Sequence, residues 1–308
     1  MTDPARQKNA ALEALLASLR QSGPAAPTIE GRRAAFDATA AAYLPLPPGT
    51  EVSEVDVDGI ASEWVRSNLS PPALDKSAVL YLHGGGFSFG SPTSHREFVA
   101  RIAASCRLPV LSLGYRLAPE HPFPAGLEDV ISAYRWLLRQ GFRADRIVIA
   151  GDSAGGGLAA SALVVLRDRS LALPAAGVMI SPWVDLTLSA GSLDRNVGTD
   201  PLVKRPSGPE TVARYIGPHG NPRDPLVSPL FADLHGLPPL LILAGLSECF
   251  LDDSLRFAAR ARRAGVDATL DAWEDMPHIW PFFAKVLPEG RAAIDDIGKY
   301  IRRKLGTT

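Results

Sequence analysis

Hydrophobic residues from position 78 onward occur in short unbroken runs, separated by longer stretches in which they recur every three or four positions. Short unbroken runs are typical of strands buried on both faces of a sheet. The predicted strands are residues 78–82, 109–115, 146–151, 177–182, 239–245 and 268–273. The stretches between them, such as 95–106 and 127–140, have the spacing of helices with one apolar face. Strands that alternate with helices indicate an α/β fold with a mostly parallel central sheet and helices on both faces.

The amino-terminal part of the chain has a different pattern. Leucines recur at helical spacing at positions 12, 15, 16 and 19, which predicts an amphipathic helix. After the proline-rich stretch 44–49, residues 51–59 and 61–67 predict an antiparallel pair of strands. Near the other end, residues 289–305 again have helical spacing and predict a last helix.

The stretch from about residue 188 to residue 229 interrupts the alternation and is rich in proline and glycine. Within it, Ser207 and Glu210 have the spacing of a capping box, so a short helix is expected to begin there. An insertion of this length in a compact α/β fold is usually a lid or a binding loop. A surface excursion without a function is the alternative.

Composition excludes several classes of protein. The chain of 308 residues is long enough for one large α/β domain or two small ones, and 46% of its residues are hydrophobic. A formal net charge of -1 argues against binding to nucleic acid or to an anionic membrane. Cys106 and Cys249 form no CxxC motif, as expected in a reducing compartment. Because the sequence has no signal peptide and no apolar stretch of membrane-spanning length, we expect a soluble, cytoplasmic protein without stable membrane insertion.

Residues 151–155 carry the pattern Gly-x-Ser-x-Gly between a predicted strand and a predicted helix. This is the pattern of a nucleophile elbow, a sharp turn that lifts a serine hydroxyl, here that of Ser153, clear of the sheet. The helix after the turn directs the positive end of its dipole at the site. A simple glycine-rich turn and a phosphate-binding loop are the alternatives, but neither Gly-Lys-Ser/Thr nor GxGxxG spacing accompanies the turn.

His83 and three consecutive glycines follow an earlier predicted strand. Consecutive glycines allow backbone N–H groups to turn inward and donate to an oxyanion. Such a loop is the expected partner of a nucleophile elbow, although by itself it could be only a flexible turn. We expect His83 to brace the loop through backbone hydrogen bonds rather than to transfer protons.

Chain order selects a general base and narrows the choice of acid. In a fold with a nucleophile elbow the triad runs serine, acid, histidine, and the acid follows a late strand, here residues 239–245. Of the six histidines, only His278 follows this strand. The candidate acids after the strand are Glu248, Asp252 and Asp253. Glu248 is favoured because it comes first, whereas the aspartates fall at the start of the next helix and could simply cap it.

Together these motifs resemble the bacterial hormone-sensitive lipase family of esterases, also called family IV. The matching stretches are residues 83–87, 115–130, 151–159, 228–242 and 276–278. The resemblance implies an α/β-hydrolase fold with a helical cap, in which Ser153 is the nucleophile and His278 the base. It also implies that the N–H groups of Gly85, Gly86 and Ala154 form the oxyanion hole.

The resemblance further implies how the chain is divided. Residues 46–187 and 230–308 would form the catalytic domain, and residues 1–45 and 188–229 the cap. Most family members have aspartate followed by Pro-Leu at the acid position, whereas Glu248 is followed by Cys-Phe. A minority branch that is similar to this sequence uses glutamate there. Gibberellin receptors related to the family have lost the histidine that is present here, which favours an enzyme.

We therefore expect a carboxylesterase that hydrolyses short- to medium-chain esters through an acyl-enzyme, without a metal or an organic cofactor. A lactone, carbamate or amide hydrolase is the first alternative, and a ligand receptor with a vestigial triad is the second. We expect the leucine face of residues 12–19, together with part of the insertion 188–229, to close over the acyl pocket. The apolar stretch 238–245 is expected toward an edge of the sheet, where pairing would form a homodimer. If the last helix covers that edge, the protein would be a monomer.

Overall fold

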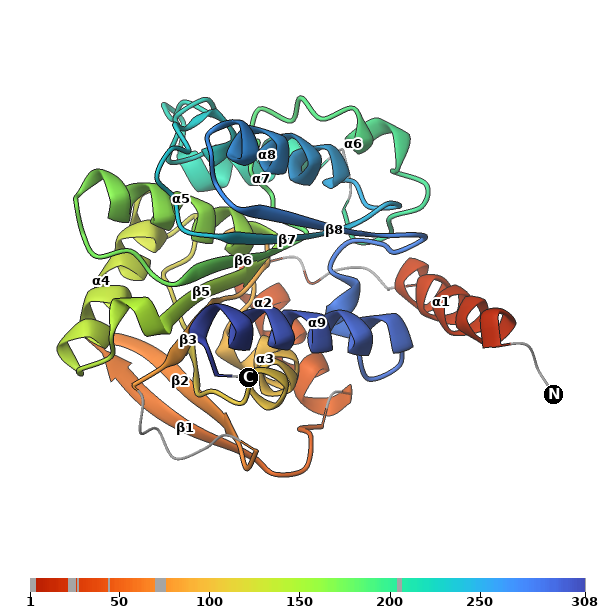
Figure 1. Cartoon of the computed structure of the whole chain (residues 1–308). Helices are drawn as coiled ribbons and strands as arrows, with labels where there is room; N and C mark the ends of the chain where they lie inside the picture. The colour runs from red at the N-terminus through yellow and green to blue at the C-terminus, as the bar shows by residue number, and fades with distance from the viewer. Residues whose placement is uncertain are drawn as a thin grey trace.

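A computed structural model describes residues 4–21, 26, 28–43, 45–69, 76–203 and 207–307. In this part of the chain, eight strands form one sheet in the order β1-β2-β4-β3-β5-β6-β7-β8 (Figure 1). The strands are β1 (Thr50–Val57), β2 (Ile60–Ser67), β3 (Ala78–Leu82), β4 (Val110–Leu113), β5 (Ile147–Asp152), β6 (Ala176–Ile180), β7 (Leu240–Gly245) and β8 (Ala268–Trp273).

The sheet is mostly parallel, as the sequence pattern predicts. β1 and β2 form the predicted antiparallel pair, and β2 pairs antiparallel with β4. From β4 through β8, neighbouring strands in the described sheet run parallel. All residues of β3, β5, β6 and β7 are buried, which explains why these strands are unbroken apolar runs in the sequence.

Helices cover both faces of the sheet, as predicted. They are α1 (Pro4–Arg20), α2 (Ile29–Tyr43), α3 (Pro92–Cys106), α4 (Ala125–Arg139), α5 (Ala154–Asp168), α6 (Ser192–Arg195), α7 (Gly208–Ile216), α8 (Leu251–Arg263) and α9 (Pro288–Leu305). Residues of α4, α5 and α8 share one hydrophobic cluster, and residues of α3 and α9 share a second cluster on the other face (Figure 1). Within the described ranges, no helix is both long enough and apolar enough to cross a membrane.

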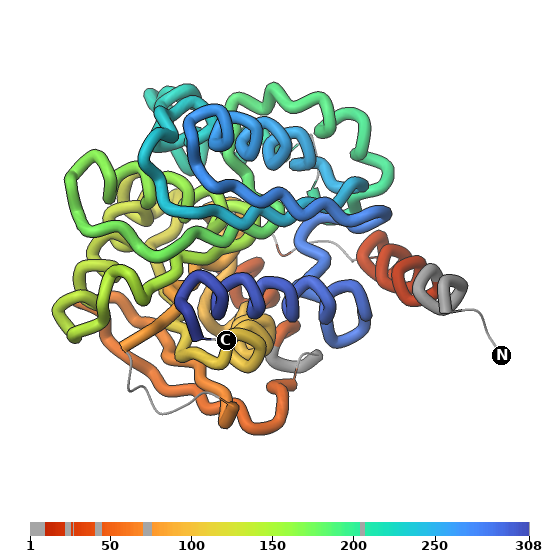
Figure 2. The backbone as a smooth tube through the Cα atoms, in the orientation of Figure 1, coloured from red at the N-terminus to blue at the C-terminus, as the bar shows by residue number. Residues whose placement is uncertain are grey.

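The predicted amino-terminal helix is α1. Its residues Leu12, Leu15 and Leu16 join the hydrophobic cluster of α3 and α9, to which Trp273 and Ile279 also belong. In Figure 2 this helix lies at the side of the molecule, next to the blue chain that follows β8. The leucine face therefore packs against the body of the protein, as expected of an amphipathic helix.

Residues 238–245 lie toward one side of the sheet, as predicted, but they are not the exposed edge that the dimer prediction assumed. β7 (Leu240–Gly245) lies between β6 and β8, so that β8 is the edge strand on this side of the described sheet. The apolar sequence of β7 indicates that both faces of the strand are buried, but it does not indicate where the strand lies in the sheet. That order depends on which side each helical crossover takes, which is a property of the whole fold.

Two local boundaries also differ from the sequence pattern. β4 ends at Leu113, before the predicted end at residue 115. At Gly114 the chain passes so close to β2 that a Cβ atom would lie 2.1 Å from the carbonyl oxygen of Ala61. Helix α7 begins at Gly208, near the predicted start, but the Ser207 side chain makes no capping hydrogen bond to it.

Candidate active site

Ser153 lies in the turn between β5 and α5, with φ 53° and ψ -119°. Non-glycine residues rarely adopt a positive φ, and such strain is typical of functional sites. Its N–H donates to the Ile180 carbonyl at 2.8 Å, and its own carbonyl accepts from Trp183 N–H at 3.0 Å. A Cβ atom on Gly155 would lie 2.0 Å from the Leu82 carbonyl oxygen, so only glycine fits there. The turn thus has the geometry expected of a nucleophile elbow.

The side chains of Ser153, His278 and Glu248 are buried and form a chain of contacts. His278 follows β8, and Glu248 lies in the turn between β7 and α8. Nε2 of His278 lies 2.8 Å from Oγ of Ser153, which is hydrogen-bonding distance. Nδ1 of the same ring lies 3.6 Å from Oε2 of Glu248, a separation longer than a hydrogen bond. Catalytic contacts are often long before substrate binds, so this arrangement is consistent with a triad.

The charge of Glu248 controls the protonation of His278. Burial lowers the pKa of His278, but the adjacent Glu248 carboxylate, with smaller contributions from Asp200 and Asp152, outweighs burial and raises this pKa above its ordinary value. Burial also raises the pKa of Glu248 itself, against the influence of the imidazole. A histidine must be neutral to accept a proton from serine. His278 can therefore act fully as a base only at a pH above its raised pKa.

The glycine loop after β3 turns sharply beside Ser153. Gly85 has φ 122° and Gly86 has φ 59°, both in the region that favours glycine. A Cβ atom on Gly85 would lie 2.2 Å from the carbonyl oxygen of Phe89, so no other residue fits. Gly85 and Gly86 line the same cavity as Ser153, and Ala154 is the buried first residue of α5.

A buried polar cluster holds this loop from behind. Oδ1 of Asp152 accepts hydrogen bonds from the Tyr81 hydroxyl at 2.7 Å and from Gly84 N–H at 3.0 Å. Nδ1 of His83 lies 2.8 Å from the Gly84 carbonyl oxygen, and the Tyr115 hydroxyl donates to the His83 carbonyl. Burial lowers the pKa of His83 to about 3, so that this ring stays neutral near pH 7. His83 therefore has the contacts of a brace and not those of a proton carrier.

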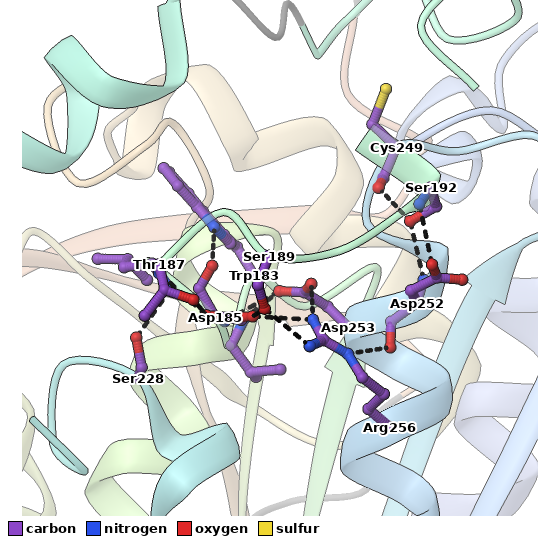
Figure 3. A network of polar contacts seen from close by, with 12 residues as sticks. Trp183, Asp185, Thr187, Ser189, Ser192, Ser228, Cys249, Asp252, Asp253 and Arg256 are labelled. Atoms are coloured by element: carbon purple, nitrogen blue, oxygen red, sulfur yellow. Dashed lines mark hydrogen bonds and ion pairs between the residues drawn. The ribbon is translucent and has the colours of Figure 1, made fainter. Parts of the chain in front are cut away.

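Asp252 and Asp253 have other partners, although both lie in the first turn of α8 (Figure 3). Oδ2 of Asp252 accepts from Ser192 N–H at 2.9 Å. Oδ2 of Asp253 accepts from the N–H groups of Val184 and Asp185 at 3.0 and 2.9 Å. The two aspartates therefore attach the chain after β6 to α8 instead of capping α8, and of the three candidate acids it is Glu248 that pairs with His278.

A cavity of about 350 Å³ opens at Ser153 and is mostly apolar. Trp183 and Phe250 stack with their ring centroids 5.1 Å apart, and Phe250 meets the His278 ring edge-on at 5.2 Å. Phe36 of α2 lines another part of the cavity. None of the sequence motifs points to these three aromatic residues as part of the site. The position of Trp183 just after a predicted strand and that of Phe250 just after the candidate acid are the signals that could have done so.

The insertion lines this cavity, whereas α1 does not. The insertion residues at the cavity are Leu188, Leu193, Leu202, Val203, Ser207, Gly208 and Thr211. Among the residues that the structure describes, none from α1 is part of the lining. The prediction that the leucine face of residues 12–19 closes over the pocket is therefore wrong for the described side chains, because Leu12, Leu15 and Leu16 pack in the cluster of α3 and α9. In the same described residues, no group of three or more His, Cys, Asp or Glu side chains is arranged to hold a metal ion.

Known proteins resemble this chain over most of its length. Residues 79–282 match a family model described as the α/β hydrolase fold. The chain is 42% identical to an acetyl-hydrolase of Streptomyces hygroscopicus, over 90% of this chain and 91% of that protein. It is 33% identical to an esterase of Acinetobacter venetianus, over 83% of this chain and 84% of that protein. A solved esterase of the bacterial hormone-sensitive lipase family has a TM-score of 0.92 and 42% identity, covering 99% of this chain and 100% of that one. The chain therefore belongs to the bacterial hormone-sensitive lipase family of α/β-hydrolase-fold esterases, and it is a carboxylic ester hydrolase.

Proposed function

We propose that Ser153 is the nucleophile, His278 the general base and Glu248 the acid that orients and stabilises the imidazolium. The 2.8 Å contact between His278 Nε2 and Ser153 Oγ carries this proposal. As the serine oxygen attacks the ester carbonyl, its proton passes to Nε2, and the ring then protonates the departing alcohol. Water that loses a proton to the same ring attacks the acyl-enzyme, releases the carboxylic acid and restores the serine.

We further propose that the N–H groups of Gly85, Gly86 and Ala154 stabilise the oxyanion of each tetrahedral intermediate. The common cavity of Gly85, Gly86 and Ser153 supports this role, as does the position of Ala154 at the start of α5. Because the Gly84 N–H is bound to Asp152, the loop is already held in shape before reaction. Donors that need no rearrangement stabilise developing charge most effectively.

We propose esters of short to medium acyl chain length as the substrates. The cavity volume of about 350 Å³ is near the lower end for small-molecule sites, and its lining is mainly aromatic and aliphatic. The relative from Streptomyces hygroscopicus is named an acetyl-hydrolase, which is consistent with a small acyl group. The insertion 188–229 and α2 are proposed as the cap that sets this limit, since both contribute side chains to the cavity.

Covalent titration tests the proposal directly. An excess of an alkyl p-nitrophenyl phosphonate is expected to release about one equivalent of p-nitrophenolate per chain, because the serine oxygen displaces it at phosphorus and the adduct does not turn over. Intact-mass measurement should show one phosphonyl group, and a panel of p-nitrophenyl esters should show lower kcat/KM for long acyl chains than for butyrate. A protein that neither hydrolyses the esters nor takes up the phosphonate would contradict the proposal.

We propose that the protein forms a homodimer through its edge strand. β8 has a strand neighbour on one side only in the described sheet, and of its residues only Ala268 is buried. Unpaired strand edges tend to pair with another chain, and a two-fold contact is the commonest symmetric solution. Light scattering at micromolar concentration should give about twice the 32.8 kDa of one chain. A mass near 32.8 kDa would show a monomer instead.

We also propose that the enzyme works in the cytoplasm. Cys106 and Cys249 are free thiols, both buried. They belong to separate hydrophobic clusters, so they do not form a pair with each other. Free cysteines of this kind are common in proteins of reducing compartments.

A further inference from the structure

Glu248 lies in a turn whose own hydrogen bonds at the acid are backbone ones: its N–H donates to the Gly245 carbonyl at 3.2 Å, and its carbonyl accepts from Leu251 N–H at 3.4 Å. This acid turn, residues 246–250, joins β7 to α8. The Glu248 side chain is fully buried, and neither of its carboxylate oxygens makes a hydrogen bond to the described residues. The position of the carboxylate beside His278 is therefore determined by the backbone of the turn and by packing.

Side chains from the insertion bind the backbone of this acid turn. Nδ2 of Asn196 donates to the Glu248 carbonyl at 2.9 Å and to the Leu246 carbonyl at 3.2 Å. Oγ1 of Thr199 donates to the Ser247 carbonyl at 2.9 Å. These carbonyls are consecutive along the chain, so two side chains of the insertion hold the turn at the acid and just before it.

The residue after the acid, Cys249, is held through both of its backbone polar groups. Oδ2 of Asp200 accepts from Cys249 N–H at 2.8 Å. Oγ of Ser192 donates to the Cys249 carbonyl at 2.7 Å and accepts from Asp252 N–H at 3.0 Å, and so connects the turn to α8 (Figure 3). Asp200 and Ser192 are only 2% and 0% exposed, and hydrogen bonds shielded from water are stronger than exposed ones.

The same segment of the insertion also faces the substrate cavity. Backbone groups in a turn between a strand and a helix are often bound by the turn itself or by water. Here the N–H groups of residues 246–248 bind backbone carbonyls, but the carbonyls of residues 246–249 and the Cys249 N–H bind side chains from residues 192–200. Leu193 within this segment and Leu202 and Val203 just after it line the cavity. One segment therefore contacts both the acid turn and the site where the acyl group would lie.

We propose that Asn196, Thr199 and Asp200 are positioning residues that keep the Glu248 carboxylate beside Nδ1 of His278. The proposal rests on the acid role proposed for Glu248. A displacement of about 1 Å can reduce the rate about 100-fold, and the present 3.6 Å separation is already longer than a hydrogen bond. Among the described residues, none of the three lines the cavity. Asn196 and Thr199 are uncharged, so their effect must pass through the acid turn, whereas the Asp200 carboxylate also raises the pKa of His278 directly.

Asn196→Ala is the sharpest test, because it removes two hydrogen bonds to the turn without changing a charge. We expect kcat to fall about 10- to 100-fold while KM stays within about 2-fold of the wild-type value. In a Glu248→Gln background the same substitution should cause little further loss, because the group that it positions is already ineffective. Asn221→Ala is the matched control and should keep wild-type kcat, since Asn221 lies in the same insertion but its side chain binds Arg223 N–H.

Each outcome of this experiment decides the inference. A wild-type kcat in folded Asn196→Ala would overturn it. It would also be overturned if Asn196→Ala lowered kcat by the same factor in the Glu248→Gln background as in the wild type. If Asn196→Ala fails to fold, Thr199→Val removes the bond to Ser247 with almost no change of shape and should lower kcat several-fold. A wild-type kcat in that variant would likewise overturn the inference. Full activity of Glu248→Gln itself would instead refute the acid assignment, and that result is distinguishable from failure of the positioning role alone.

Discussion

Replacing Ser153 with alanine is expected to reduce kcat for p-nitrophenyl butyrate by about 10⁴-fold or more. Alanine cannot form an acyl-enzyme, and water in its place would attack without a fixed approach to the carbonyl. The fold should survive, because the lost hydroxyl contacts His278 at 2.8 Å while the turn itself is held by backbone hydrogen bonds. Steady-state kinetics and thermal unfolding of the same preparation check both parts of the expectation.

A second buried serine on the same helix provides the matched control for this experiment. Ser161 donates to the Gly157 carbonyl within α5 and is 2% exposed, but it does not line the cavity. Ser161→Ala should therefore retain wild-type kcat and still react with one equivalent of phosphonate. Near-normal hydrolysis by Ser153→Ala, or phosphonylation of that variant at the wild-type stoichiometry, would refute the assignment of the nucleophile.

Glu248→Gln is expected to lower kcat by about 10³- to 10⁴-fold with little loss of stability. A neutral amide cannot stabilise the imidazolium that forms when His278 accepts the serine proton, and it no longer selects the required tautomer. Stability should change little, because the carboxylate oxygens make no hydrogen bonds to the described residues. Kinetics with the same ester and a denaturation curve provide the two measurements.

Asp252→Asn is the comparison variant for the acid. Asp252 binds Ser192 N–H and Arg195, so its loss should cost far less activity than the loss of Glu248. The reverse ranking of the two variants would show that Glu248 is not the acid.

The pH profile gives Glu248→Gln a second, independent readout. In the wild type, burial lowers the pKa of His278 but the Glu248 carboxylate raises it above the ordinary value. Neutral imidazole is the active form, so activity should rise with pH through this raised pKa and fall as pH drops below it. Without the carboxylate, burial lowers the pKa of His278, and the acid limb of kcat/KM should therefore move to lower pH. An acid limb that stays in place would mean that Glu248 does not control the protonation of His278.

Much of the candidate site could be predicted because its motifs follow from steric limits between backbone segments, which only certain residues satisfy. A Cβ atom on Gly155 would lie 2.0 Å from the Leu82 carbonyl oxygen, and one on Gly85 would lie 2.2 Å from the Phe89 carbonyl oxygen. Such close approaches exclude every residue except glycine, so they leave a mark in the sequence. His278 and Glu248 could be selected because both follow late strands of the predicted parallel sheet. The carboxyl-terminal ends of such strands lie side by side, which places both residues near the elbow.

Other parts of the site left no comparable signal. Asp252 and Asp253 have the sequence context of helix caps, yet they bind backbone groups of residues 184–192. Nothing in the local pattern around Asn196 indicates that its amide holds the carbonyl of Glu248. A polar side chain can satisfy its hydrogen bonds with many partners, and the sequence does not record which one packing brings near.

The sequence by itself determined the alternation of strands and helices, the elbow at Ser153, the glycine loop and the small set of triad candidates. These features follow from side-chain periodicity and from steric limits within a few residues. Only the tertiary structure decided that β8 and not β7 is the edge strand, that the leucines of α1 pack away from the cavity, and that the insertion binds the acid turn. Periodicity reports that a face is buried but not what buries it, because contacts between distant segments depend on the path of every crossover between them.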